Sequence, residues 1–130
     1  MNDIDAFLAG VSFAVAGASR NRAKYGNKVL RAYLQRGRRV LAINPHEREI
    51  EGVPCHPDPA SLPVPVHGLS IITPPRETER LVEQAAAAGI RHLWMQPGAE
   101  SPPALARAAA LGLNCIADGS CILVALGFRE

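Results

Sequence analysis

One segment near the start of the chain limits its fold more than any other. Apolar side chains alternate with small ones over residues 11–15, and the run stops at Gly17. Apolar residues at helical spacing follow from Val29 and end before Gly37. A buried strand, a glycine turn and a helix that opens behind it are typical of a phosphate-binding unit, because the free N–H groups of a helix N-terminus carry the positive end of the helix dipole.

The rest of the chain alternates strands with helices. A short helix is expected over residues 3–8, and an irregular, proline-rich stretch over 46–66 holds a small hairpin near 49–53. The strands expected after the first are residues 40–43, 69–72, 93–95 and 115–117, and helices are expected over 76–88 and from Ser101 to Gly112. This alternation predicts an α/β, Rossmann-like, doubly wound parallel sheet of about five strands in one domain, residues 1–130. Right-handed crossovers favour the strand order 3-2-1-4-5.

Four Gly, Pro or small polar segments follow the expected strands. Because the carboxyl ends of parallel strands meet at one edge of a sheet, we expect these segments to form a ligand crevice there. They are Gly17, Ala18 and Ser19; Asn44 and Pro45; Thr73, Pro74 and Pro75; and Gln96, Pro97 and Gly98.

The turn after the first strand is expected to bind phosphate. The N–H groups of Ala18 and Ser19 and the Ser19 hydroxyl would donate to it, Lys24 would serve as a mobile cation, and Arg20 and Arg22 add positive charge. The full G-x-G-x-x-G dinucleotide motif is absent, so an ordinary turn with solvated arginines stays open as the alternative.

The end of the second expected strand distinguishes between nucleotides. An NAD site usually places an acidic residue there to accept from the ribose 2′-hydroxyl, whereas this chain has Asn44 and Pro45. His46 and Arg48 follow and would suit a phosphorylated ribose. Glu47 weakens that local field, and an exposed loop is the alternative reading.

Composition and residue spacing argue against several classes of protein. A net charge of +2 and 5 % aromatic residues speak against a nucleic-acid partner, and no apolar run approaches the roughly 20 residues that span a membrane. The three cysteines show no C-x-x-C spacing and no secretory signal is evident, so we expect reduced thiols in a cytoplasmic protein. The four histidines lack metal-ligand spacing, and no acid–base pair stands out, so neither a metal site nor catalytic residues are expected.

Several motifs together resemble the stand-alone CoA-binding domain proteins. The resemblance covers about residues 12–121, and its most specific parts are the Asn-Pro pair after the second strand and the Trp-Met-Gln-Pro-Gly segment at 94–98. The other matching motifs are VAGAS at 15–19, KYG at 24–26, LAI at 41–43, IEGVP at 50–54, SL at 61–62, PP at 74–75 and AGI at 88–90. This family is similar to the amino-terminal CoA-binding domain of the succinyl-CoA synthetase alpha subunit and of related ADP-forming acyl-CoA synthetases.

The resemblance implies coenzyme A as the ligand and gives the candidate residues roles. It implies that Gly17, Ala18 and Ser19 line the diphosphate with Lys24 as charge partner, and that Asn44, Pro45 and the basic residues after them flank the adenosine and its 3′-phosphate. Further contacts are implied for Ile72, Thr73 and Pro74 beside the nucleotide and for Gln96 and Gly98 along the pantetheine. Two residues separate Asp118 from Cys121 where the family has one, which puts a role for Cys121 in doubt.

The expected function is therefore non-catalytic binding of CoA or an acyl-CoA. A small NAD(P)-dependent oxidoreductase or redox-sensing domain is one alternative, and a regulatory subunit controlled by CoA, with a ligase subunit as partner, is another. The apolar tail over residues 122–128 also predicts a homodimer, since one small sheet would leave part of it exposed.

Overall fold

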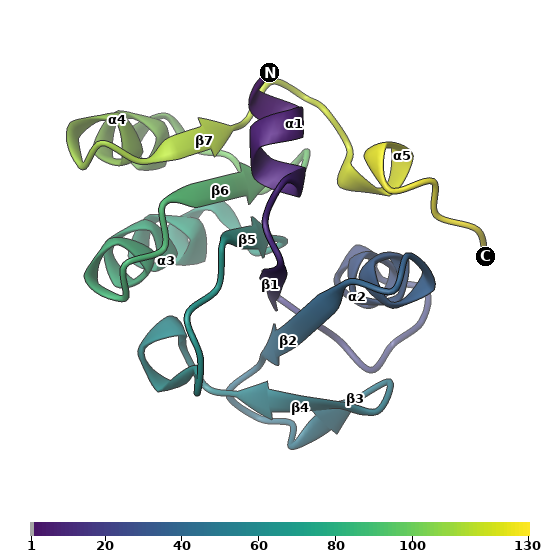
Figure 1. Ribbon diagram of the computed structural model, residues 1–130. Helices are drawn as coiled ribbons and strands as arrows, with labels where there is room; N and C mark the ends of the chain where they lie inside the picture. The colour runs from purple at the N-terminus through teal and green to yellow at the C-terminus, as the bar shows by residue number, and fades with distance from the viewer. Residues whose placement is uncertain (1) are drawn as a thin grey trace.

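The computed structural model describes residues 2–130, and within them the chain forms one seven-stranded sheet. The strand order is β3-β4-β2-β1-β5-β6-β7, and all neighbours are parallel except the hairpin pair β3 and β4 (Figure 1). The strands are β1 (Ser12–Ala16), β2 (Arg39–Ile43), β3 (Glu49–Ile50), β4 (Val53–His56), β5 (Gly68–Ile71), β6 (His92–Met95) and β7 (Asn114–Ile116).

Helices cover both faces of the sheet, as the alternating pattern predicts. In Figure 1, α3 and α4 lie over one face, and α2 and α5 lie over the other. The helices are α1 (Asp3–Leu8), α2 (Tyr25–Gln35), α3 (Pro75–Ala87), α4 (Pro102–Ala110) and α5 (Ile122–Ala125), with a 3₁₀ turn, η1, over Pro59–Ser61. The predicted Rossmann-like α/β class is therefore confirmed.

The sheet has seven strands where about five were predicted, because the hairpin adds β3 and β4, and the predicted strand order is wrong in one respect. The strand expected third, β5, pairs with β1 in the register Ala14↔Leu69, and not with β2. The free edge of β2 is taken by β4, which pairs with it in the register Ala42↔Cys55. Because the hairpin brings β4 back parallel to β2, the chain can continue the sheet only on the other side of β1. The direction of winding thus reverses between β1 and β5, where an open α/β sheet places its ligand crevice.

The central strands are buried on both sides, which explains their continuous apolar sequences. Trp94 and Met95 are fully buried, as expected of core residues. A polar contact also lies inside the core, where the Tyr33 hydroxyl of α2 and the Ser70 hydroxyl of β5 are 2.7 Å apart. Burial raises the pKa of Tyr33 far above its usual range, so this phenol stays neutral.

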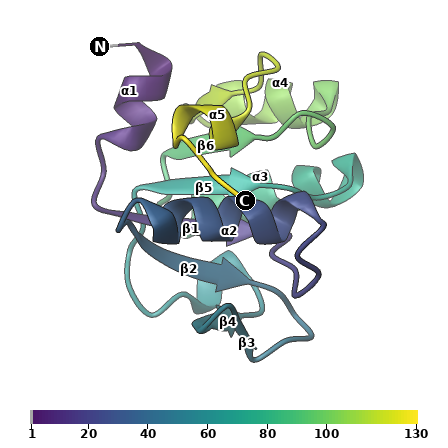
Figure 2. The same cartoon turned by 90° about the vertical axis from the view of Figure 1, so that its right-hand side faces the viewer.

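The apolar tail packs against the molecule more fully than its sequence suggests. Ile122 and Leu126 are buried, and α5 lies beside α2 on the same side of the sheet (Figure 2). Val124 remains 81 % exposed. The tail therefore gives less support for self-association than expected, and the homodimer stays a prediction. Among residues 2–130, no helix combines the length and hydropathy needed to cross a membrane.

Candidate functional site

The turn after β1 is shaped by two glycines that allow close backbone contacts. Gly17 has a φ of +87°, in the left-handed region, and a Cβ there would collide with the carbonyl oxygen of Ile72. Gly26, at the second position of α2, faces the carbonyl oxygen of Gly17, and a Cβ would collide with that atom too. The two glycines therefore let the turn fit between the end of β5 and the N-terminus of α2.

Two asparagine side chains fix the orientation of this turn. The Asn44 amide donates to the carbonyl oxygen of Ala18, and the Asn27 amide donates to that of Ser19, both at 2.9 Å. The N–H groups of Ala18 and Ser19 have no hydrogen-bond partner anywhere in residues 2–130. Both carbonyl oxygens are thus engaged while the two N–H donors are left unpaired, and their binding of an anion stays a prediction.

The turn opens onto a cavity of about 660 Å³ at the carboxyl edge of the sheet. The first residues of α2 border it, and Lys24 occupies the N-cap position of that helix without capping it through its side chain. The exposed Lys24 ammonium and the unpaired helix N-terminus make this cavity electropositive. The cavity is lined by Gly17, Ala18, Ser19, Ala23, Lys24, Tyr25, Gly26, Asn44, Ile72, Thr73 and Pro74.

A second cavity, of about 390 Å³, lies between the loop after β2 and one face of α3. Its basic side chains are His46 and Arg80, and it also has two carboxylates. Asp58 accepts a hydrogen bond from the Ser61 N–H at 2.9 Å, and Glu77 lies 3.9 Å from Arg80. Its other lining residues are Ala16, Gly17, Ala18, Ile43, Asn44, Pro45, Pro57, Thr73, Leu81 and Gln84.

A third cavity, of about 290 Å³, lies where β6 ends and the C-terminal tail begins. Gln96 is 3 % exposed and is fixed at both ends of its amide. Its Nε2 donates to Cys121 Sγ at 3.1 Å, and its Oε1 accepts from the Ile122 N–H at 2.8 Å. Tyr25, Ile72 and Pro97 complete the lining.

Neighbouring cavities have lining residues in common, so the three together form one crevice along the loops at the carboxyl ends of the strands. The first and second are both bordered by Gly17, Ala18, Asn44 and Thr73, and the first and third by Tyr25 and Ile72. The electropositive turn lies in the middle of this crevice.

Most of the predicted site residues line this crevice, but the structure does not bring Arg20, Arg48 or Gly98 to it. The Arg20 guanidinium lies 3.2 Å from the Glu47 carboxylate, so an acidic neighbour engages it. The Arg48 side chain is exposed, and the Gly98 N–H donates to the Glu100 carboxylate at 2.7 Å.

Sequence reasoning missed the contribution of α3 to the crevice. Glu77, Arg80, Leu81 and Gln84 recur at i, i+3, i+4 and i+7, which marks one helical face. The helix over residues 76–88 was predicted, but the sequence alone does not show that this face borders the crevice. Asn27 was also missed, because a polar residue in an amphipathic helix looks solvated until its tertiary contacts are known.

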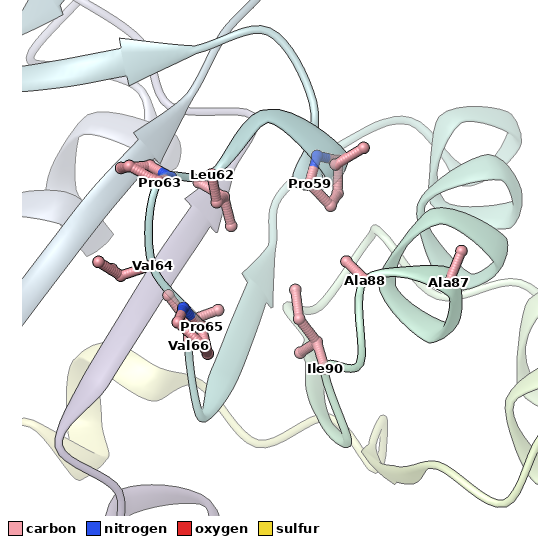
Figure 3. Close-up of a pocket in the computed structure, with 10 residues that line it drawn as sticks. Pro59, Leu62, Pro63, Val64, Pro65, Val66, Ala87, Ala88 and Ile90 are labelled. Carbon is pink, nitrogen blue, oxygen red and sulfur yellow. The ribbon is translucent and has the colours of Figure 1, made fainter.

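A further cavity, of about 340 Å³, lies away from this crevice, between the segment that leads into β5 and the end of α3 (Figure 3). It is lined by apolar side chains alone, among them Pro59, Leu62, Val66 and Ile90. It offers no side-chain donor or charge to a phosphate, so the candidate site is the crevice at the carboxyl edge.

Residues 11–127 match the family model described as CoA binding domain. The chain belongs to this family. A solved structure of a conserved hypothetical protein from Pyrococcus furiosus is 38 % identical, with a TM-score of 0.83 over 88 % of this chain and 97 % of that one.

Part of the chain is also similar to much larger enzymes. Acetate–CoA ligase [ADP-forming] I from Archaeoglobus fulgidus is 35 % identical over 71 residues, which are 55 % of this chain and 10 % of the ligase. The dinucleotide-forming acetyl-coenzyme A synthetase 1 of Ca. Korarchaeum cryptofilum, solved with phosphate and ADP, is 26 % identical, with a TM-score of 0.79 over 92 % of this chain and 28 % of that one. The chain is thus similar to a small protein over nearly that protein's whole length and to a minor part of two much larger enzymes.

Proposed function

We propose that the chain binds coenzyme A, free or acylated, along the carboxyl edge of its sheet, and that it has no catalytic activity of its own. The observation that carries the proposal is that three cavities with lining residues in common adjoin a turn whose N–H groups are unpaired. Coenzyme A is elongated, with a diphosphate in its middle, so an extended crevice with a central anion site suits it. Membership of the CoA-binding domain family supports the same ligand.

Each part of the ligand has a matching part of the crevice. The diphosphate accepts from the N–H groups of Ala18 and Ser19 next to Lys24. The adenosine occupies the cavity beside α3, where His46 and Arg80 meet its 3′-phosphate. The pantetheine runs past Ile72 toward the third cavity.

The proposal is tested by calorimetric titration with CoA, dephospho-CoA, NADH and NADPH. Coenzyme A should bind, and dephospho-CoA should bind at least about tenfold more weakly, because a charge-assisted hydrogen bond is worth about 1.5–3 kcal/mol. Arg80→Ala should reduce that difference. Arg76→Ala is the matched control, since Arg76 is exposed on the same helix and lines none of the three cavities.

The titration also decides between the ligand classes. Binding of NADH or NADPH with none of CoA would overturn the proposal and favour a small oxidoreductase. Equal affinity for CoA and dephospho-CoA would contradict the proposed contact of His46 and Arg80 with the 3′-phosphate.

The location and partners of the protein belong to the same proposal. The three free cysteines suit the reducing cytoplasm. The similarity to acetate–CoA ligase suggests a separate ligase subunit as partner, and the exposed Val124 gives a homodimer a contact point. Detection of only a monomer by light scattering at micromolar concentration would contradict the homodimer.

A further inference from the structure

We propose that Glu51 is a positioning residue for the anion-binding turn, although it lies on the β3–β4 hairpin and not in the crevice. Its carboxylate holds the Asn27 side chain, which in turn holds the carbonyl group of Ser19. The inference rests on the proposed function, because the turn that is held is the one that receives the diphosphate.

The backbone of Glu51 is the first indication of this role. Within residues 2–130, Glu51 is the one residue other than glycine with a positive φ, which is 51°. Gly52 follows with a φ of 79°, and the pair connects β3 to β4. Two consecutive positive φ values between paired antiparallel strands are the geometry of a type I′ turn, which favours Asn or Gly at its first position. The hairpin alone does not account for a glutamate there.

The side chain of Glu51 supplies the second indication. Its Oε2 accepts from Asn27 Nδ2 at 3.0 Å and lies 3.4 Å from Arg22 Nε. Asn27 is fully buried, and its amide is completely engaged: Nδ2 also donates to the Ser19 carbonyl at 2.9 Å, and Oδ1 accepts from Arg31 Nε at 2.6 Å. The hairpin, α2 and the turn are thus joined through one buried amide.

The same group of residues also holds the other end of the loop. Arg31 donates from its guanidinium to the carbonyl oxygen of Arg22 at 3.1 Å, while the Arg22 guanidinium pairs with Glu51. Residues 19–22 are therefore held at both ends by hydrogen bonds and an ion pair in the absence of ligand. A loop that is ordered in advance does not have to be ordered by its ligand, and this preorganisation increases affinity.

Simple electrostatics predicts the opposite effect for this carboxylate. A negative charge near a site for a polyanion repels the ligand, and its removal also frees the Arg22 guanidinium. On charge alone, loss of Glu51 should strengthen the binding of CoA. If Glu51 positions the turn, its loss should weaken binding. The sign of the change therefore separates the two effects.

The experiment compares Glu51→Gly with Glu51→Gln and Glu49→Gln. Glycine suits the positive φ of this turn, and the relief of backbone strain offsets part of the lost contact to Asn27, so the first variant should still fold. Glu51→Gln keeps an acceptor for Asn27 without the charge. Glu49→Gln removes the same charge two residues away, from an exposed side chain that forms no ion pair in the described part of the chain.

Two measurements are made on each protein: the Kd for CoA, and amide hydrogen exchange over residues 19–24 without ligand. Glu51→Gly should raise the Kd about tenfold, the loss expected for a hydrogen bond to a charged group, and should speed exchange over residues 19–24. Glu51→Gln should retain most of the affinity, and Glu49→Gln should match the natural chain in both measurements.

Unchanged or tighter binding by Glu51→Gly, with unchanged exchange over residues 19–24, would overturn the inference. Failure of the natural chain to bind CoA would instead overturn the proposed function. In that case the exchange measurement would still decide whether Glu51 holds the turn, so the two failures are distinguishable.

Discussion

Replacement of Gly26 by alanine tests whether the turn must lie directly against α2. Within a helix this substitution normally stabilises by up to about 1 kcal/mol, because glycine has more backbone freedom to lose. Here the added Cβ would overlap the carbonyl oxygen of Gly17. Overpacking costs about 1–3 kcal/mol, and a backbone carbonyl held by its neighbours cannot rotate away as a flexible side chain would. We therefore expect a net loss of about 1–2 kcal/mol, with Tm lower by about 3–8 °C.

Gly26→Ala should also weaken binding. The methyl group moves the turn away from the N-terminus of α2, so the two no longer face the same anion, and CoA affinity should fall at least about tenfold. Gly37→Ala is the matched control at the other end of the same helix. It has a φ of +66° with no atom within 4 Å of an added Cβ, so it should lose about 1–2 kcal/mol through backbone strain and still bind CoA normally. A Gly26→Ala protein with natural Tm and affinity would refute the reasoning.

Lys24→Ala should weaken CoA binding by about 1–3 kcal/mol, less at high salt, and equal affinities at low salt in calorimetry would show that the ammonium does not reach the phosphates. Tyr33→Phe leaves the buried Ser70 hydroxyl without its partner at 2.7 Å and should cost about 1–3 kcal/mol in urea unfolding, part of which a Ser70→Ala second change recovers. Burial, then His67 and Arg91, lowers the pKa of His92 below 6.5, so the unfolded chain binds the extra proton. The free energy of unfolding should therefore be independent of His92 above about pH 6.5 and should fall as the pH drops below it. His92→Gln should make this fall shallower in urea unfolding.

Features encoded by neighbouring residues could be predicted from the sequence. The helix expected over residues 3–8 is α1, and the small hairpin expected near 49–53 is β3 and β4. The helix expected to begin at Ser101 is α4, and the Ser101 hydroxyl caps it by accepting from the Ala104 N–H at 3.1 Å. Each depends on a pattern within a few residues, such as an apolar spacing, a cap or a turn, so tertiary contacts did not have to be known.

The strand order depends on which strand pairs with the free edge of β2, and patterns within a few residues do not show this. The segment around Val53 contains Pro54 and Cys55 and lacks the β-branched run that marks a buried strand. It becomes β4 because the hairpin turns the chain back beside β2, where the backbone groups of an edge strand are open to pairing. Once that edge is occupied, β5 must pair with β1 on the other side. The hairpin itself was predicted, but the pairing of β4 with β2 was not, and that pairing changes the neighbours of β5.

The basic loop shows the same limit at the site. From the sequence, Arg20 and Arg22 appear available to an anionic ligand. In the folded chain, Glu47 and Glu51 lie 3.2 Å and 3.4 Å from their guanidinium groups. The carboxylates come from the segment between β2 and β4, 27 and 29 residues away along the chain, so only the fold brings them there. The loop arginines are thereby used to fix the loop, and the free donors at the turn are the N–H groups and Lys24. Anion binding at this turn is therefore a property of its backbone geometry more than of the local count of cations.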